Sequence, residues 1–227
     1  MADLPPLRLS LHEWASLKTE LVWVYDRTVA PEYRHFHEVA GQTGYWARYV
    51  RAGRVAFTKH GDRIEAGAGQ WLTGAREKGM MDITDDAHIL SIHFLCQWPT
   101  GDNFFGKAGV QLIADNICPA LRRQAEEMAR AVRRKHPTVS AGTGYAHEQA
   151  AYPEFLRQQA LFVNWLATWC EVMGARGWRP AYGGSADERL TRVVRRLNDT
   201  PLADGFPRHV LQSEAKLSAG QLDLRFQ

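Results

Sequence analysis

The sequence has few cysteines that could form disulfides, and it lacks a long apolar stretch that could anchor the protein in a membrane. It holds three cysteines among 227 residues. Cys96, Cys118 and Cys170 are far apart in apolar surroundings, which predicts reduced thiols rather than disulfides or a metal knuckle. No stretch approaches the roughly 18 uncharged apolar residues of a membrane span, and the first residues lack the basic and apolar regions of a leader peptide. We therefore expect a cytoplasmic protein with no membrane partner.

An excess of charge of one sign is also missing. The formal net charge is +3, and with 45% hydrophobic and 23% charged residues the composition is that of an ordinary globular protein. Basic residues gather in two runs, 130–135 and 189–196, each equally typical of a solvated helix face. No Ser/His/Asp or Cys/His arrangement has catalytic spacing, and no Gly-rich loop fits a phosphate cradle. We expect no enzyme, no catalytic residues and no cofactor.

The front half of the chain divides into short strand-like segments separated by glycines. This spacing is typical of a closed or sandwiched antiparallel barrel. Between two of the segments His60 and Gly61 predict a tight hairpin turn, because Gly accepts the positive φ that such turns require. The predicted strands are 21–29, 45–52, 54–60, 63–66, 70–73, 80–84 and 88–96.

A metal site is the next possibility. Gly67 and Gly69 resemble the second cupin motif, but Leu72 stands where that motif has a ligand His. His35 and His37 form a His-x-His with a Glu directly after it, instead of three or four residues later. Because a cupin metal site needs two or three imidazoles and a carboxylate that converge, we predict no metal and a loop with two exposed imidazoles.

The back half reads as helical. Apolar residues recur at helical spacing over 110–135, where Pro119 is expected to start the longer helix, and over 153–174. The second helix has an apolar surface wide enough for the protein core alone, or for the core and a second copy in a homodimer. The Gly-rich segment 177–185 reads as a linker.

The tail has the pattern of two short helices joined by a tight turn. Leu211 and Ala215 share one helical face, and Leu222 and Phe226 repeat that spacing after the turn. Ser218 is placed to cap the second helix. This pattern predicts a helix-turn-helix, and nucleic acid as the partner.

The order of parts, and the tail above all, resembles the AraC/XylS family of transcription regulators. Gln212 stands where Ala is usual in the family, and Lys216 replaces a Gly. The resemblance implies an α+β fold, with a cupin-like antiparallel barrel and two helices in a sensing and dimerisation domain (1–176), a linker (177–185) and a partial DNA-binding domain (186–227). Family members have two helix-turn-helix units, so we expect a fragment of a longer regulator or the product of a shortened gene.

For DNA the resemblance implies contacts from the first helix of the unit and from the recognition helix. Gln221 is the best candidate for reading an adenine edge, because its amide both donates and accepts. The expected DNA-binding residues are Arg189, Arg192, Ser218, Ala219, Gly220, Gln221, Asp223 and Arg225.

For the effector the resemblance implies a pocket in the barrel. Arg27 follows Asp26, and this dipeptide resembles one that places an arginine in a sugar pocket of the family. Strand alternation puts Trp46 with Arg48 on one face, and Ser91 with His93 on another. An aromatic platform beside hydrogen-bonding groups suits a sugar. The expected effector-binding residues are Arg27, Trp46, Arg48, Asp82, Ser91 and His93.

The sequence therefore predicts a ligand-responsive transcription regulator, or its sensing half. Its partners would be a small molecule, DNA and a second copy of the chain. Two alternatives stay open: a stand-alone small-molecule-binding module with a vestigial DNA-binding segment, and a metal-dependent cupin enzyme.

Overall fold

The computed structural model describes residues 9–38, 44–106, 109–137, 144–145, 148–181, 193, 196–197, 200 and 208–221. The described strands are β1 (Lys18–Thr28), β2 (His35–Glu38), β3 (Tyr45–Ala52), β4 (Arg54–Lys59), β5 (Asp62–Gly67), β6 (Gln70–Ala75), β7 (Gly79–Ile83), β8 (His88–Gln97) and β9 (Gln111–Ala114). The described helices are α1 (Leu11–Ala15), α2 (Pro119–Lys135), α3 (Tyr152–Ala175) and α5 (Arg208–Ala215), with short 3₁₀ turns at Pro31–Tyr33 and Asp115–Ile117. No helix in these ranges combines the length and apolar character that crossing a membrane requires.

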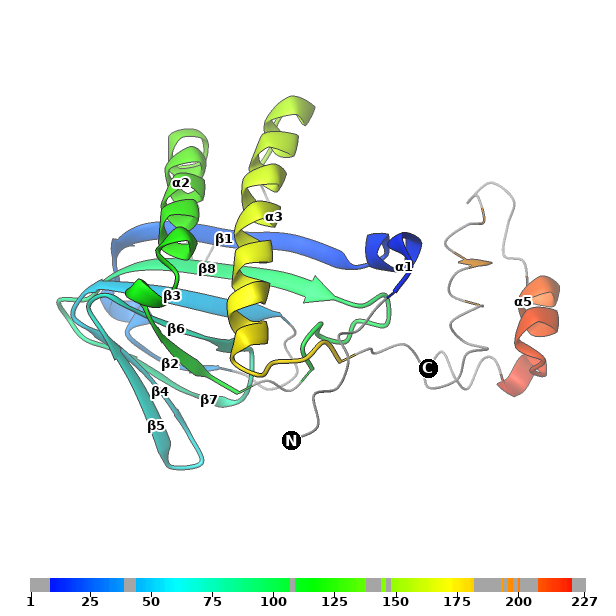
Figure 1. Ribbon diagram of the computed structural model, residues 1–227, viewed down its shortest axis with the longest axis horizontal. Helices are drawn as coiled ribbons and strands as arrows, with labels where there is room; N and C mark the ends of the chain where they lie inside the picture. Colours follow the sequence, from blue (N-terminus) through cyan, green and yellow to red (C-terminus); the bar gives the residue numbers. More distant parts are fainter. Residues whose placement is uncertain are drawn as a thin grey trace.

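The strands form two antiparallel sheets, ordered β1-β8-β3-β6-β9 and β2-β7-β4-β5 (Figure 1). Consecutive strands often belong to different sheets, as β3 and β4 do, and β7 and β8. The first and last strand of each order pair on one side only, so each sheet has two edge strands and the described strands close no barrel. The expected α+β class, with antiparallel strands before helices, is confirmed. Of the closed and sandwiched arrangements that the sequence allows, the described strands form two antiparallel sheets and no closed barrel.

All the strands that the sequence predicts are present, with ends shifted by a few residues. The hairpin between β4 and β5 is also present, and His60 and Gly61 there have φ of 52° and 91°. Two strands, β2 and β9, are absent from the prediction. In β9 the residues Leu112 and Ile113 fit helical spacing, but they alternate between the two faces of an edge strand that pairs with β6. The helix itself starts at Pro119, as predicted.

An apolar layer fills the space between the sheets. Trp46, Leu72 and Ile89 of the five-stranded sheet pack with Phe57 and Met81 of the four-stranded sheet, and all are nearly or fully buried. We call the side of the five-stranded sheet that faces this layer its inner face.

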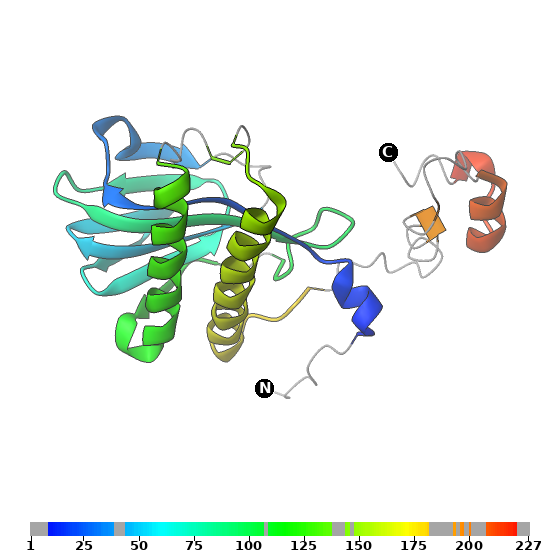
Figure 2. The same ribbon diagram turned by 90° about the horizontal axis from the view of Figure 1, so that it is seen from above.

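Helices α2 and α3 lie side by side over the other side of the five-stranded sheet, its outer face (Figure 2). The layer between these helices and the sheet is aromatic. The ring of Phe94 on β8 lies 4.9 Å from that of Trp169 and 5.1 Å from that of Trp165, both edge to face. The indole Nε1 of Trp169 donates to Thr73 Oγ1 at 3.1 Å, which satisfies one polar atom of this layer. The predicted helix 153–174 corresponds to α3.

The chain packs further along this layer than the linker prediction allows. Trp178 is buried and joins the aromatic cluster of the outer face. The backbone N–H of Ala181 donates to the carbonyl of Phe104 at 2.8 Å. The residues up to Ala181 therefore belong to the packed domain, and the rest of the predicted linker, 182–185, lies outside the described residues.

The tail is described in part. Leu211 and Ala215 of α5 are fully buried against Val193. Lys216 ends the helix with a φ of 51°, a left-handed conformation that favours Gly. Helical residues resume at 219–221, whereas 222–227 lie outside the description. A complete helix-turn-helix is therefore not established.

All three cysteines are free thiols. Cys96 is buried in the aromatic layer, where burial raises the pKa of its thiol to about 12. It is therefore an un-ionised core residue at neutral pH.

Candidate functional site

A cluster of polar side chains lies between the two sheets. Arg48, Ser91 and His93 project from the inner face, and strand pairing places Arg48 beside Ser91. Glu38 reaches them from β2, and all four are at most 5% exposed. Arg76, directly after β6, completes the set, which we call the interior cluster.

Glu38 joins two guanidinium groups in this cluster. Its Oε2 accepts from Nε and Nη2 of Arg76 at 3.1 and 3.0 Å, and its Oε1 lies 3.7 Å from Nη2 of Arg48. Arg48 also donates to the sulfur of Met81 at 3.5 Å. Burial lowers the pKa of Arg48, and the Glu38 carboxylate opposes that change. Because buried ion pairs are costly to desolvate, folding stability alone is a poor reason for placing these charges here.

His93 is the least satisfied member. Neither ring nitrogen has a hydrogen-bond partner among the described residues, and the same holds for Nε1 of Trp46 and of Trp23. Burial, with the charges of Arg76 and Arg48, lowers the pKa of His93 to about 3. The imidazole is therefore neutral at pH 7, with one nitrogen able to donate and the other to accept.

Other side chains already pack against Trp46, the expected aromatic platform. The guanidinium carbon of Arg48 lies 4.6 Å from the centre of the Trp46 ring, and the Phe57 ring packs at 5.8 Å. The ring face that Arg48 covers is therefore open to a sugar only if Arg48 moves. The arrangement favours polar recognition by Arg48 over stacking.

Two of the expected effector residues lie elsewhere. Arg27 is exposed at the end of β1, 4.8 Å from the Tyr25 ring, and lines a separate cavity of about 440 Å³ beside the end of α2. Asp82 follows the buried Met81, so alternation along β7 turns it to the outer side of the smaller sheet. There it bonds His35 Nδ1 and Arg63 Nη1, both at 3.0 Å. The structure groups only Trp46, Arg48, Ser91 and His93 of the predicted set.

Two members of the interior cluster are absent from the sequence prediction. Glu38 belongs to β2, which the sequence suggests is a loop, and Arg76 follows the end of a strand. The alternation of His35-Phe36-His37-Glu38 was the available signal for Glu38. His35 itself is exposed and bonded to Asp82, and no three His, Cys, Asp or Glu side chains of the described ranges gather as a metal site.

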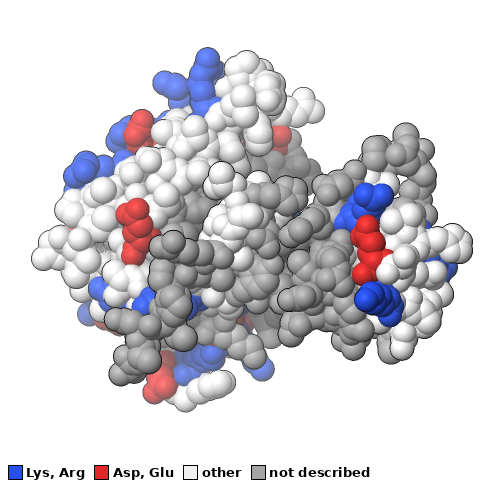
Figure 3. Space-filling model, turned by 45° about the vertical axis from the view of Figure 1, so that its right-hand side comes forward, with Lys and Arg blue, Asp and Glu red and all other residues white. Residues whose placement is uncertain are grey.

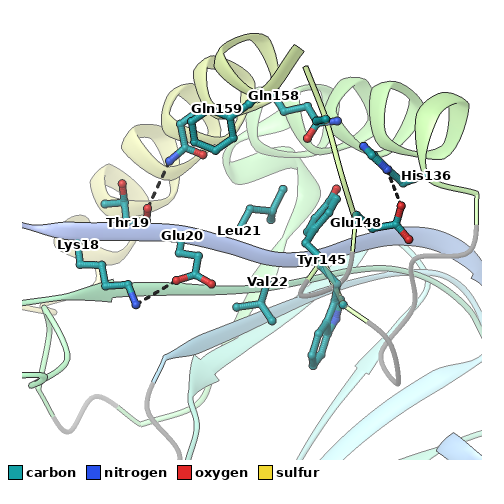
Figure 4. A pocket seen from close by; sticks show the side chains of 14 residues that line it. Lys18, Thr19, Glu20, Leu21, Val22, His136, Tyr145, Glu148, Gln158 and Gln159 are labelled. Carbon is teal, nitrogen blue, oxygen red and sulfur yellow. Dashed lines mark hydrogen bonds and ion pairs between the residues drawn. The ribbon is translucent and has the colours of Figure 1, made fainter. Parts of the chain in front are cut away.

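A second candidate is a cavity of about 590 Å³ along the free edge of β1, which we call the edge pocket. It lies between β1, the described residues that connect α2 to α3, and the start of α3 (Figure 4). The backbone N–H of Tyr145 donates to the carbonyl of Val22 at 3.1 Å, which fixes the connecting segment on the strand edge. Trp23 lines the pocket and also contacts His93, with ring centres 4.2 Å apart. The edge pocket and the interior cluster therefore share a wall.

The expected DNA-binding residues are described only in part. Ser218 and Gln221 form a reciprocal capping box: Ser218 N–H donates to Gln221 Oε1 at 3.0 Å, and Gln221 N–H donates to Ser218 Oγ at 3.3 Å. Ala219 and Gly220 are exposed between them. Figure 3 shows basic and acidic side chains interspersed over the described part of one face. The others, Arg189, Arg192, Asp223 and Arg225, lie outside the described residues.

No protein-family model and no curated protein sequence matches the chain. Among solved structures, apo ToxT from Vibrio cholerae strain SCE256 matches at 10% identity and a TM-score of 0.40, over 93% of this chain and 74% of that one. ToxT from Vibrio cholerae O395 matches over the same shares at 10% identity and a TM-score of 0.34. The AraC-like transcriptional activator CuxR matches at 10% identity and a TM-score of 0.27, over 79% of this chain and 59% of that one.

These values describe a distant structural likeness to AraC-like regulators. They place the chain in no family. The function is therefore argued from its own residues.

Proposed function

We propose that this chain is the sensing part of a ligand-responsive transcription regulator of the AraC type. A small polar effector binds at the interior cluster, and the segment from residue 186 onward contacts DNA. The interior cluster carries the proposal, because it places charged and unpartnered polar groups where a purely structural protein would have apolar side chains.

The charges of the cluster indicate the chemistry of the effector. Arg48 and Arg76 face a single carboxylate, Glu38, so one positive charge of the cluster has no counterpart within it. His93 and the Trp46 indole add neutral hydrogen-bonding groups. A small hydroxylated carboxylate, such as a sugar acid, supplies the missing negative charge and hydroxyls for those groups.

The described tail supports the DNA-binding half of the proposal. Buried Leu211 and Ala215, the left-handed Lys216 and the Ser218 capping box follow one another at the spacing of a helix-turn-helix. A helix N-terminus also favours phosphate contact. The expected homodimer fits the exposed apolar side chains on α3, of which Tyr152 is 72% and Val163 46% exposed.

A thermal-shift screen tests the effector. We expect glucuronate or galacturonate to raise the unfolding temperature more than glucose does, since a ligand at about a hundred times its dissociation constant adds roughly 2.7 kcal/mol. Arg48→Met should abolish the shift. Arg63→Met, a matched change of an arginine on the outer side of the smaller sheet, should preserve it. Equal shifts in both variants, or no shift with any hydroxylated acid, would overturn the assignment.

Selection from a random duplex DNA pool tests the partner. Ala219→Glu places a negative charge at a helix N-terminus, where it favours the helix but repels phosphate, so we expect enrichment to be lost while folding is kept. Ala52→Glu, at the exposed end of β3, is the control. If wild type binds an acid but selects no sequence, the stand-alone binding module replaces the regulator.

A further inference from the structure

The edge pocket holds three polar atoms that the described protein leaves unpartnered. They are the Tyr145 hydroxyl, Nε2 of Gln158 and Nε1 of Trp23, and each is shielded from solvent. Figure 4 shows Tyr145 rising between β1 and the helices, with its hydroxyl toward the Gln158 amide. Tyr145 and Gln158 come from different segments and approach each other only in the folded chain, whereas Trp23 pairs with His93 at the wall shared with the interior cluster.

We propose that the edge pocket is a second small-molecule site, separate from the interior cluster, and that it takes a neutral compound with carbonyl or ether oxygens on a flat apolar body. Each of its three unpartnered atoms can donate a hydrogen bond. A ligand that supplies acceptors between β1 and α3 satisfies the Tyr145 and Gln158 donors.

The charged groups of the pocket favour a neutral ligand over an anion. Lys18 and Glu20 pair with each other at 3.0 Å. Glu148 lies 2.8 Å from His136, so its carboxylate already has a partner. Burial and the nearby Glu148 raise the pKa of Tyr145, which keeps the phenol protonated and able to donate. An anion would meet the Glu148 carboxylate without a cation reserved for it.

The walls and size of the pocket fit a flat apolar body. Leu21, Val22 and Phe155 line it together with Ala150. Its volume of about 590 Å³ lies within the roughly 300–1,000 Å³ typical of small-molecule sites. A ligand here would touch β1 and α3 together and would lie against Trp23, the wall shared with the interior cluster.

Coumarin, a flat neutral lactone, is the test probe, and the indole N–H signals in a nitrogen-15 NMR spectrum are the readout. Trp23→Phe assigns the Trp23 signal. Titration should shift that signal saturably, and Tyr145→Phe should weaken coumarin binding roughly tenfold, the loss of about one hydrogen bond. Tyr33→Phe removes the same hydroxyl from an exposed residue of the Pro31–Tyr33 turn and should leave the affinity unchanged.

Two ligand controls complete the design. Naphthalene, which has the shape but no acceptor, should bind more weakly than coumarin, and benzoate should bind more weakly because it is charged. The proposal is overturned if coumarin leaves the Trp23 signal unmoved, or if Tyr145→Phe binds coumarin as well as Tyr33→Phe does. Trp23→Phe serves only to assign the signal, and Tyr145→Phe changes no residue of the interior cluster, so the affinity comparison is independent of the effector screen.

Discussion

The two faces of the five-stranded sheet differ in composition: the outer face is aromatic, whereas the inner face carries charged and polar side chains. The outer face meets α2 and α3 through aromatic rings, and its ionisable groups, Tyr45 and Cys96, are kept neutral by burial, which raises the pKa of both. The inner face carries the charges of Arg48, beside Glu38 of the other sheet, at about 5% exposure. The outer face therefore stabilises the fold through apolar burial. The inner face lowers stability, because burying its charged groups costs free energy, but those groups suit recognition of a ligand.

The largest effect is expected on the outer face. Trp169 is fully buried, with rings on several sides. Trp169→Ala should lower the free energy of unfolding by about 3–5 kcal/mol, because it removes a buried indole and leaves a cavity among the surrounding rings. Denaturant titration measures this, with Tyr33→Ala at an exposed aromatic residue as the control. A loss below about 1 kcal/mol would show that the aromatic layer is not the stabilising core.

Breaking the inner-face ion pair should cost nearly as much. Glu38→Gln leaves two guanidinium groups without their shared carboxylate, and we expect a loss of about 3 kcal/mol. The matched control is Glu65→Gln on exposed β5, where the Arg63 partner lies 3.1 Å away and the loss should stay below about 1 kcal/mol. By contrast, the double change Glu38→Leu with Arg48→Met should restore stability and abolish effector binding. If the double variant still binds, the interior cluster is structural.

The inner face should also make stability depend on pH. The pKa of His93 is about 3 in the folded protein against about 6.5 when unfolded. The unfolded chain binds the proton first, so His93 favours folding fully above pH 6.5 and progressively less as the pH falls toward 3. Between pH 7.5 and 5 this amounts to roughly 2 kcal/mol. His93→Phe should flatten the curve by that amount, and parallel curves for the two proteins would contradict the burial of a neutral imidazole.

Much of the sheet is predictable from the sequence, because glycine-bounded segments with period-two alternation are a local signal. The alternation also places Trp46 with Arg48, and Ser91 with His93. Their meeting across β3 and β8 is a matter of register, which sequence spacing alone does not supply. Asp82 is an example of a wrong assignment. The sequence groups it with the effector-binding residues, but it directly follows the buried Met81 and therefore lies on the opposite side of the strand.

The remaining site residues have a weak local signal or none. The alternation over 35–38 indicates a strand with Glu38 on its buried side, but it does not show that the carboxylate forms an ion pair, because Arg48 and Arg76 lie elsewhere in the sequence. The edge pocket is less visible still, since Tyr145, Gln158 and Trp23 line one cavity only when the segment between α2 and α3 packs on the edge of β1. Such contacts depend on tertiary packing, and the structure was needed to find them.

The smallest effect is expected where charges lie at the rim of the outer face. Asp26 accepts from Nε and Nη2 of Arg51 at 2.8 and 2.7 Å, and Arg51 also reaches Glu126 of α2 at 2.9 Å. Burial opposes ionisation of Asp26, but the bonds from Arg51 prevail and lower its pKa. Because the pair is partly exposed, Asp26→Asn should cost only about 1 kcal/mol.

Salt separates this rim pair from the interior pair. At about 1 M salt the screening length is only about 3 Å, so the loss caused by Asp26→Asn should shrink, while that caused by Glu38→Gln should persist because solvent ions cannot reach it. Unfolding curves of both variants at low and high salt measure the difference. Equal salt sensitivity would mean that water and ions reach the interior cluster, and the contrast between the two faces would then be one of degree.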